Sequence, residues 1–218
     1  VITTINRKMT FYDYRYYNQF GVTNDLVDKY VKAVESFKID GFSNPYYYTR
    51  HDPCYEYQVN DGCIKLYFPF RNKHTANRFI TNNKCPLENL ETLIDTNYKL
   101  IVKSQKDKLL MLRILRELRI NDVRVYVIAS ETAKLPDDIV DVLRKTTRIQ
   151  VYVMLDTDNT GLTSAIEYEK NYGFIALFMT KGYSAKDPTD LVRITDYNFV
   201  KKKFANMYLN GKKGRVVP

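Results

Sequence analysis

The 218 residues suffice for one large domain or two small ones, and 44% hydrophobic with 27% charged residues is typical of a folded chain. The glycine spacings fit neither a Rossmann turn nor a P-loop, and three cysteines without a C-x-x-C pair indicate no zinc site. No apolar stretch approaches the ~18 residues of a membrane span, so we expect no membrane segment and a cytoplasmic location. The chain opens on Val1 without a signal peptide, and we expect a processed or excised piece of a longer protein.

The first half has the pattern of a small mixed α+β unit. Residues 11–40 are predicted to be helical, because apolar side chains recur there at spacings of three and four. The next sixty residues are punctuated by glycine and proline between runs rich in Tyr, Phe, Ile and Val. Two of these runs, Cys54–Val59 and Cys63–Phe70, flank Asn60-Asp61-Gly62 and predict an antiparallel hairpin.

From Lys99 onward, strand and helix patterns alternate. The predicted strands are Lys99–Lys103, Val123–Ala129, Ile149–Leu155 and Phe174–Met179, and the helices between them are Lys106–Leu118, Asp137–Lys145 and Leu162–Lys170. Nearly continuous apolar strands that alternate with helices predict an α/β fold, with a parallel sheet covered on both faces.

The net charge of +9 is concentrated at the C-terminus. The segment 199–218 has no acidic residue and contains Lys201, Lys202, Lys203, Lys212, Lys213 and Arg215. We therefore expect three parts: an α+β subdomain over 1–97, the α/β domain over 98–198, and a basic tail over 199–218. The tail either contacts phosphates or is a solvated chain end.

Acidic side chains follow the predicted strands. Asp107 follows the first, Glu131 the second, Asp156 and Asp158 the third, and Asp187 the fourth. Ligands of parallel sheets bind beyond the carboxyl ends of the strands, and carboxylate oxygens suit Mg²⁺ or Mn²⁺. These acids predict a metal site, and the alternative is that Asp156, Asp158 and Asp187 are helix caps.

These residues resemble the Toprim domain of DnaG-type primases, topoisomerases and some nucleases. Leu155–Gly161 matches its Asp-x-Asp-x-x-Gly motif, and Lys103-Ser104-Gln105-Lys106-Asp107 falls on its Glu-Gly-x-x-Asp motif with only the aspartate kept. Lys186–Asp190 resembles a Lys-Asp-Pro segment of DnaG-type primases, and Gly62–Arg71 resembles their Gly-x-Ile-x-Phe-Pro-Ile strand. The resemblance covers nearly the whole chain and is strongest to bacteriophage primases.

The resemblance implies a DNA primase core, which makes short RNA primers on single-stranded DNA from NTPs by nucleotidyl transfer. It implies two Mg²⁺ or Mn²⁺ ions on Asp107, Asp156, Asp158 and Asp187, together with Glu131, and a replicative helicase as partner. Asp107, Asp156 and Asp158 would be catalytic, together with Glu131, which we hypothesise replaces the family glutamate lost at Lys103.

Basic residues would contact nucleotide or template phosphates: Lys65, Arg71, Lys73, Arg78, Lys103 and Lys186. The run Tyr46–Tyr48 either stacks on bases or forms a strand edge. Two alternatives for the function remain: a Toprim-type metal-dependent nuclease, and a non-catalytic nucleic-acid-binding module whose Lys103 marks a degenerate site.

Overall fold

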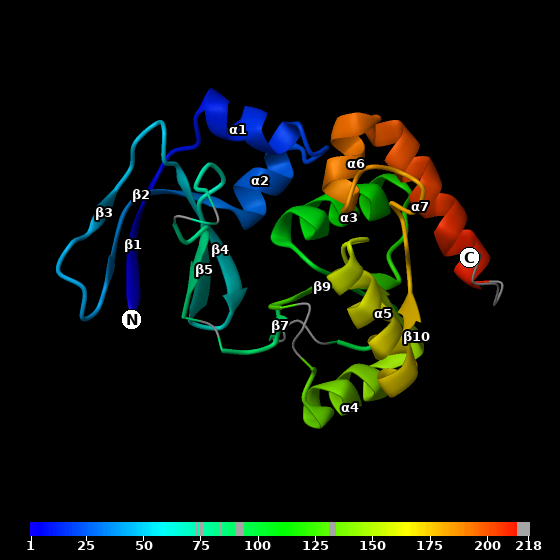
Figure 1. Cartoon of the computed structure of the whole chain (residues 1–218). Helices are drawn as coiled ribbons and strands as arrows, with labels where there is room; N and C mark the ends of the chain where they lie inside the picture. The colour runs from blue at the N-terminus through cyan, green and yellow to red at the C-terminus, as the bar shows by residue number, and fades with distance from the viewer. Residues whose placement is uncertain (73, 75, 83, 90–93, 131–133, 213–218) are drawn as a thin grey trace. The chain divides into compact units, whose positions relative to one another are not determined.

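The computed structural model describes the chain except residues 73, 75, 83, 90–93, 131–133 and 213–218 (Figure 1). It divides into two compact units. Unit 1 comprises Val1–Asn18 and Thr23–Lys84, and unit 2 comprises Gln19–Val22 and Cys85–Pro218. The division after residue 84 assigns the segment 85–97 to the second unit, whereas the sequence pattern suggested a boundary at 97.

Unit 1 is built on an antiparallel sheet. Its strands are β1 (Ile2–Arg7), β2 (Lys32–Ile39), β3 (Tyr46–Tyr47), β4 (Cys54–Asn60), β5 (Cys63–Tyr67) and β6 (Phe79–Thr81). They run in the order β1-β2-β4-β5-β6, with β3 paired to β2. The helices α1 (Phe11–Asn18) and α2 (Asn24–Tyr30) lie between β1 and β2 in the chain. Tyrosine pairs connect α1 to the sheet, since the Tyr17 and Tyr57 hydroxyls lie 2.7 Å apart and those of Tyr16 and Tyr67 2.6 Å apart.

The predicted hairpin is confirmed, but the helical prediction for residues 11–40 is wrong over its last third. Strands β4 and β5 flank a turn in which Gly62 has a φ of +65°, a conformation that glycine adopts without strain. Segment 32–39 is a strand that pairs with both β1 and β4. Val34 and Phe37 pack there with Leu66 in the core of the unit, so strand pairing and burial override the helix-like spacing.

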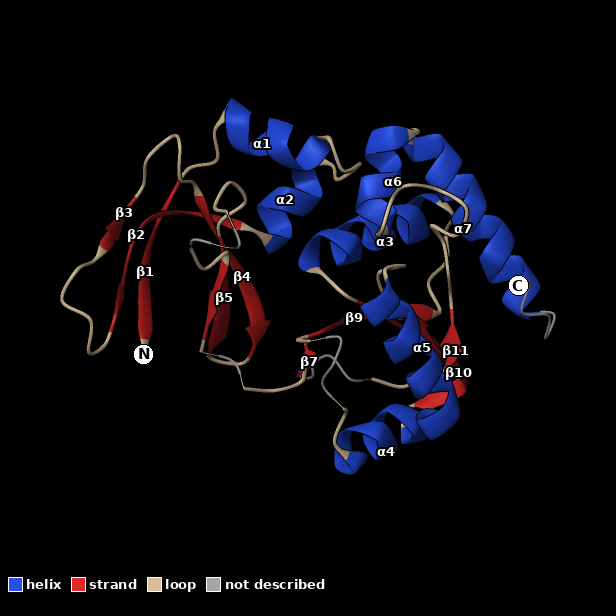
Figure 2. Ribbon diagram, in the orientation of Figure 1, coloured by secondary structure: helices blue, strands red, loops and turns tan. Residues whose placement is uncertain are grey.

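Unit 2 is an α/β domain, as the alternating pattern predicts (Figure 2). Its sheet has the order β11 (Ile175–Ala176), β10 (Thr147–Met154), β8 (Thr96–Val102), β9 (Val123–Ile128) and β7 (Leu87–Glu88). The first four are parallel, and the short β7, which the sequence did not predict, pairs antiparallel with β9. The helices are α3 (Gln105–Glu117), α4 (Asp137–Lys145), α5 (Asn159–Tyr172), α6 (Pro188–Ile194) and α7 (Tyr197–Lys212).

Helices cover both faces of this sheet. Residues of α3, α6 and α7 form one apolar cluster with the side chains of Leu100 and Val102. Residues of α4 and α5 form a second cluster with Ile101 and Val153, which point to the opposite face. The alternation along β8 thus divides the core into two layers and leaves the carboxyl ends of the strands at one edge.

The segment expected to be a basic tail is helical as far as residue 212. Val200 and Phe204 are buried in the core, at the four-residue spacing of one helix face. On the outer side, the Lys201 ammonium lies 2.9 Å from the Glu117 carboxylate. None of the helices in the described part of the chain is long and apolar enough to cross a membrane.

Candidate active site

The first acidic position lies where β8 passes into α3. Ser104 is the N-cap of α3: its Oγ accepts a hydrogen bond from the Asp107 amide at 3.1 Å and donates one to Asp107 Oδ2 at 2.6 Å. Asp107 is 1% exposed. Its other oxygen, Oδ1, has no hydrogen-bond partner among the described residues. The capping geometry therefore provides a hydrogen-bond donor for only one of the two oxygens of this buried carboxyl group.

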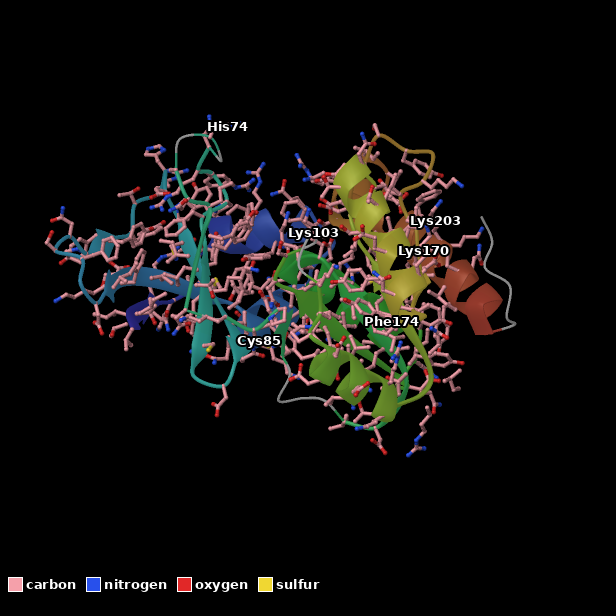
Figure 3. All side chains as sticks on the ribbon, turned by 60° about the horizontal axis from the view of Figure 1, so that its bottom comes forward. His74, Cys85, Lys103, Lys170, Phe174 and Lys203 are labelled. Atoms are coloured by element: carbon pink, nitrogen blue, oxygen red, sulfur yellow. The ribbon has the colours of Figure 1, made fainter. Side chains whose placement is uncertain are left out.

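Asp156 lies just beyond the end of β10 and is also 1% exposed. Two ammonium groups approach the same oxygen, with Lys103 Nζ at 2.7 Å and Lys186 Nζ at 3.6 Å from Oδ2. Lys103, labelled in Figure 3, belongs to the loop between β8 and α3. The carboxylate that the sequence predicted as a metal ligand is therefore ion-paired to lysine in this structure.

The glycine of the Asp-x-Asp-x-x-Gly motif has a steric role. A Cβ at Gly161 would overlap the Asp156 carbonyl group, whose carbon would be only 2.8 Å away. The first turn of α5 can therefore lie directly against the Asp156 backbone only if residue 161 lacks a side chain. Asp158 caps the same turn, since its Oδ1 accepts a hydrogen bond from the Gly161 amide at 3.0 Å.

Asp187 caps α6, and its loop is tied to that of Asp156. Its Oδ1 accepts hydrogen bonds from the Asp190 amide at 2.6 Å and the Thr189 hydroxyl at 2.8 Å. The Thr157 amide donates to the Lys186 carbonyl at 2.8 Å, which fixes the two loops side by side. Asp158 and Asp187 thus have the capping role that the sequence left open as the alternative.

Two other aspartates act electrostatically on Asp107. Burial raises the pKa of Asp107 to about 8, and the negative charges of Asp187 and Asp156 add to this effect. The Ser104 hydrogen bond and the Lys106 ammonium act in the opposite direction. The negative charges of Asp187 and Asp156 therefore both act on the Asp107 carboxyl group.

The described residues do not form a complete metal site as they stand. Among the residues that the structure describes, no three His, Cys, Asp or Glu side chains come together in a way that could hold a metal ion. Glu131, the proposed replacement for the lost family glutamate, lies outside the described residues, so that hypothesis stays a prediction.

The basic residues predicted for unit 1 have different surroundings. Arg71 is held by Asp52 through Nε and Nη2 at 2.9 and 2.6 Å, and its guanidinium lies 3.4 Å from the centre of the Phe68 ring. Arg78 Nη2 donates to the Pro69 carbonyl at 3.1 Å. The Lys65 ammonium lies over the Phe79 ring of β6, and Lys73 lies outside the described residues. Arg71 is therefore engaged in the structure of the unit itself.

An aromatic group at the edge of the same sheet was missed by the sequence analysis. Phe79 on β6 stacks on Tyr67, with ring centres 5.0 Å apart, yet is 51% exposed. The Lys65 ammonium lies 5.3 Å from the centre of the Phe79 ring. The pairing of β5 with β6 creates this group, which no sequence motif indicated.

The tyrosine run Tyr46–Tyr48 has a different setting. The Tyr46 ring stacks on Phe37, with ring centres 4.9 Å apart, which supports the alternative that this run forms a strand edge.

Neither a family model nor a curated protein matches the sequence. The structure, however, is similar to solved primase structures. The primase fragment of the bacteriophage T7 primase-helicase protein aligns with a TM-score of 0.54 at 11% identity, over 93% of this chain and 79% of that one. The RNA polymerase domain of the Mycobacterium tuberculosis primase DnaG, in complex with double-stranded DNA, aligns with a TM-score of 0.56 at 10% identity, over 88% and 72%.

The chain has the fold of a DnaG-type primase core. A further similar structure contains T7 primase domains bound to an RNA/DNA hybrid and dTTP, with a TM-score of 0.56 at 12% identity and 87% of each chain covered. At this level of identity the likeness establishes the primase fold, and the roles of single residues rest on this chain's own geometry.

Proposed function

We propose that the chain is the catalytic core of a DNA primase, which synthesises short RNA primers on single-stranded DNA from nucleoside triphosphates. The observation that carries the proposal is a primase fold in which the buried Asp107 is acted on by the charges of Asp156 and Asp187. Carboxylates that are buried close together repel one another and call for a cation. Phosphoryl transfer uses cations held by such carboxylates, because its transition state accumulates negative charge on oxygen, which a cation stabilises.

The donor set fits Mg²⁺ or Mn²⁺ by its chemistry. Hard cations prefer carboxylate oxygens, and the second oxygen of Asp107 is a buried acceptor without a partner in the described residues. We propose that Asp107, Asp156, Asp158 and Asp187 hold two ions, with Glu131 as the further carboxylate. When bound, the ions would activate the primer 3′-oxygen and stabilise the leaving pyrophosphate.

The basic residues beside these acids would bind the triphosphate. Lys103 and Lys186 reach Asp156 from two different loops, which supports contact of both ammonium groups with the phosphates of a triphosphate bound beside Asp156. Each is a compact charge on a flexible stem, which suits contact with a phosphate that moves during transfer. Their role here would be to position the triphosphate.

Unit 1 would bind the template. Phe79 offers an exposed ring on which an unpaired base can stack, and Lys65 beside it suits a backbone phosphate. Arg78, and Lys73 in the connection before it, would add positive charge. We propose single-stranded DNA as the partner of this face and a replicative helicase as the partner of the protein, as the sequence resemblance implies.

The decisive experiment offers the chain a single-stranded DNA template, labelled NTPs and Mg²⁺ or Mn²⁺. We expect oligoribonucleotides that depend on template and metal and that disappear in Asp156→Asn. The matched control is Asp28→Asn, which changes a carboxylate that accepts a hydrogen bond from Tyr14 in unit 1. Strand cleavage without synthesis would identify the nuclease alternative instead.

One observation favours a second candidate, a non-catalytic nucleic-acid-binding module. The ion pair between Lys103 and Asp156 neutralises the carboxylate that the reaction needs. This candidate predicts that DNA binding has the same affinity in EDTA as in Mg²⁺, and that no metal supports product formation. The same assay, run with a binding measurement in parallel, distinguishes the two functions.

A further inference from the structure

We infer that Lys103, assisted by Lys186, is the resident counter-ion of Asp156 and competes with a divalent metal ion for that carboxylate. The inference deepens the proposed function, on which it rests for the metal. It differs from a simple loss of the site, because Asp156 keeps its position and its negative charge, and only the cation beside it changes.

The burial of Asp156 makes a counter-ion necessary. Its side chain is 2% exposed, and a carboxylate removed from water is destabilising unless a positive charge or several hydrogen bonds compensate. Lys103 supplies that charge at 2.7 Å. In the Toprim pattern this position carries glutamate, so the chain has a cation where the pattern has a further anion.

The two lysines differ in how firmly they are held. The Lys103 side chain is 33% exposed and bonded directly to Oδ2, whereas Lys186 is 57% exposed and 3.6 Å from the same oxygen. A divalent ion on Asp156 would have to displace Lys103 and would be repelled by both ammonium groups. Removal of Lys103 should therefore tighten metal binding more than removal of Lys186.

The test is a titration of the purified chain with Mn²⁺ alone, in which the free ion is measured by electron paramagnetic resonance. We expect Lys103→Met to lower the Kd for Mn²⁺ about tenfold and Lys186→Met about threefold, because each removes a competing positive charge. Asp156→Asn in the Lys103→Met background should abolish the gain, which locates the ion on this carboxylate.

The matched control is Lys201→Met, which removes a lysine ion-paired to Glu117 at 2.9 Å in the same unit. It should leave the Mn²⁺ affinity unchanged. An unchanged or weaker affinity in Lys103→Met overturns the inference. If that variant does not fold, an unchanged affinity in Lys186→Met overturns it instead.

The titration involves no template and no NTP, so it is independent of primer synthesis. Tighter Mn²⁺ binding in Lys103→Met, together with no synthesis by the wild-type chain, would support the counter-ion and contradict the proposed function. Synthesis by the wild-type chain, together with unchanged Mn²⁺ affinity in Lys103→Met, would support the function and contradict the counter-ion.

Discussion

Each unit contains a buried aspartate near the start of a helix, and the two are compensated very differently. In unit 1, Asp13 accepts hydrogen bonds from Arg7 Nη1 and Nη2 at 2.7 and 2.9 Å, from the Thr10 amide and hydroxyl at 2.7 Å each, and from the Tyr55 hydroxyl at 2.8 Å. In unit 2, Asp107 has Ser104 on one oxygen and no hydrogen-bond partner on the other among the described residues.

The two pKa values reflect this difference. Burial alone would raise the pKa of Asp13, but the hydrogen bonds from Arg7, Thr10 and Tyr55 outweigh it and lower the value to about 2. Burial and the neighbouring acids raise that of Asp107 to about 8. A carboxylate that serves the fold has its charge compensated within the chain, whereas one left without compensation is a candidate for a ligand.

The largest effect is expected at Asp156. Asp156→Asn keeps the shape of the side chain but removes the charge, and we expect primer synthesis to fall about a thousandfold, or ~4 kcal/mol in the transition state. Synthesis per unit of folded protein is the measurement, with circular dichroism to verify folding. A variant that retains more than a tenth of wild-type synthesis would exclude Asp156 from the reaction.

Asp13→Asn should lower the free energy of unfolding and leave primer synthesis by the folded protein unchanged. It leaves the Arg7 guanidinium buried beside an uncharged group, and loss of one partner of a buried ion pair costs about 3 kcal/mol. Urea unfolding of the whole chain measures the change, with Asp28→Asn as the surface control. A loss equal to that of the control would show that the hydrogen bonds around Asp13 contribute little.

The same residue gives a pH dependence. Because the folded pKa of about 2 lies below the usual 3.8, the stabilisation is fully present above pH 4 and is lost as the pH falls through 2. We expect ~2 kcal/mol of acid-sensitive stability from this group. The wild-type chain should lose more stability between pH 4 and pH 2 than Asp13→Asn does, and equal losses would contradict the lowered pKa.

Gly161→Ala tests the close approach of α5 to the Asp156 backbone, and it leaves every charge of the site in place. The new methyl group would meet the Asp156 backbone, and α5 would have to shift away from the loop. We expect a loss of about 2 kcal/mol in stability, as for other overpacked sites. Gly173→Ala is the matched control for glycine removal, since its Cβ would enter open space, although its φ of +68° adds strain of its own. Thermal unfolding of both variants gives the comparison, and a larger loss at residue 173 would contradict the steric role of Gly161.

The elements of unit 2 could be predicted because each has its own local signal. Strand β8 ends in the apolar run Leu100–Val102, α3 follows with apolar spacing of three and four, and Gly62 in unit 1 marks a hairpin. Strand β2 could not be predicted, because its state depends on pairing with β1 and β4. The Lys-rich run of α7 was interpreted as a tail because its charges obscured the buried Val200 and Phe204.

The candidate site could be predicted by position but not by contact. Strand ends identified where the acids gather, since parallel strands end at one edge of a sheet. The ion pair between Lys103 and Asp156 joins residues 53 positions apart and depends on the paths of two loops. No spacing rule indicates whether a carboxylate there pairs with a lysine, caps a helix or stays open to solvent. The partner of each carboxylate determines what the site can bind.

The smallest effect on stability is expected at Asp107, and it completes the contrast with Asp13. Because burial raises the pKa of Asp107 to about 8, its carboxyl group is mostly protonated at neutral pH, and Asp107→Asn replaces it with another uncharged group whose oxygen can still accept a hydrogen bond from Ser104. We therefore expect stability to change by less than ~1 kcal/mol. Primer synthesis should nevertheless be lost if the carboxylate holds a metal ion. Urea unfolding and synthesis of the same preparation measure both quantities. A loss of stability as large as that of Asp13→Asn would instead make Asp107 a structural residue, and the difference between the two units would then carry no functional meaning.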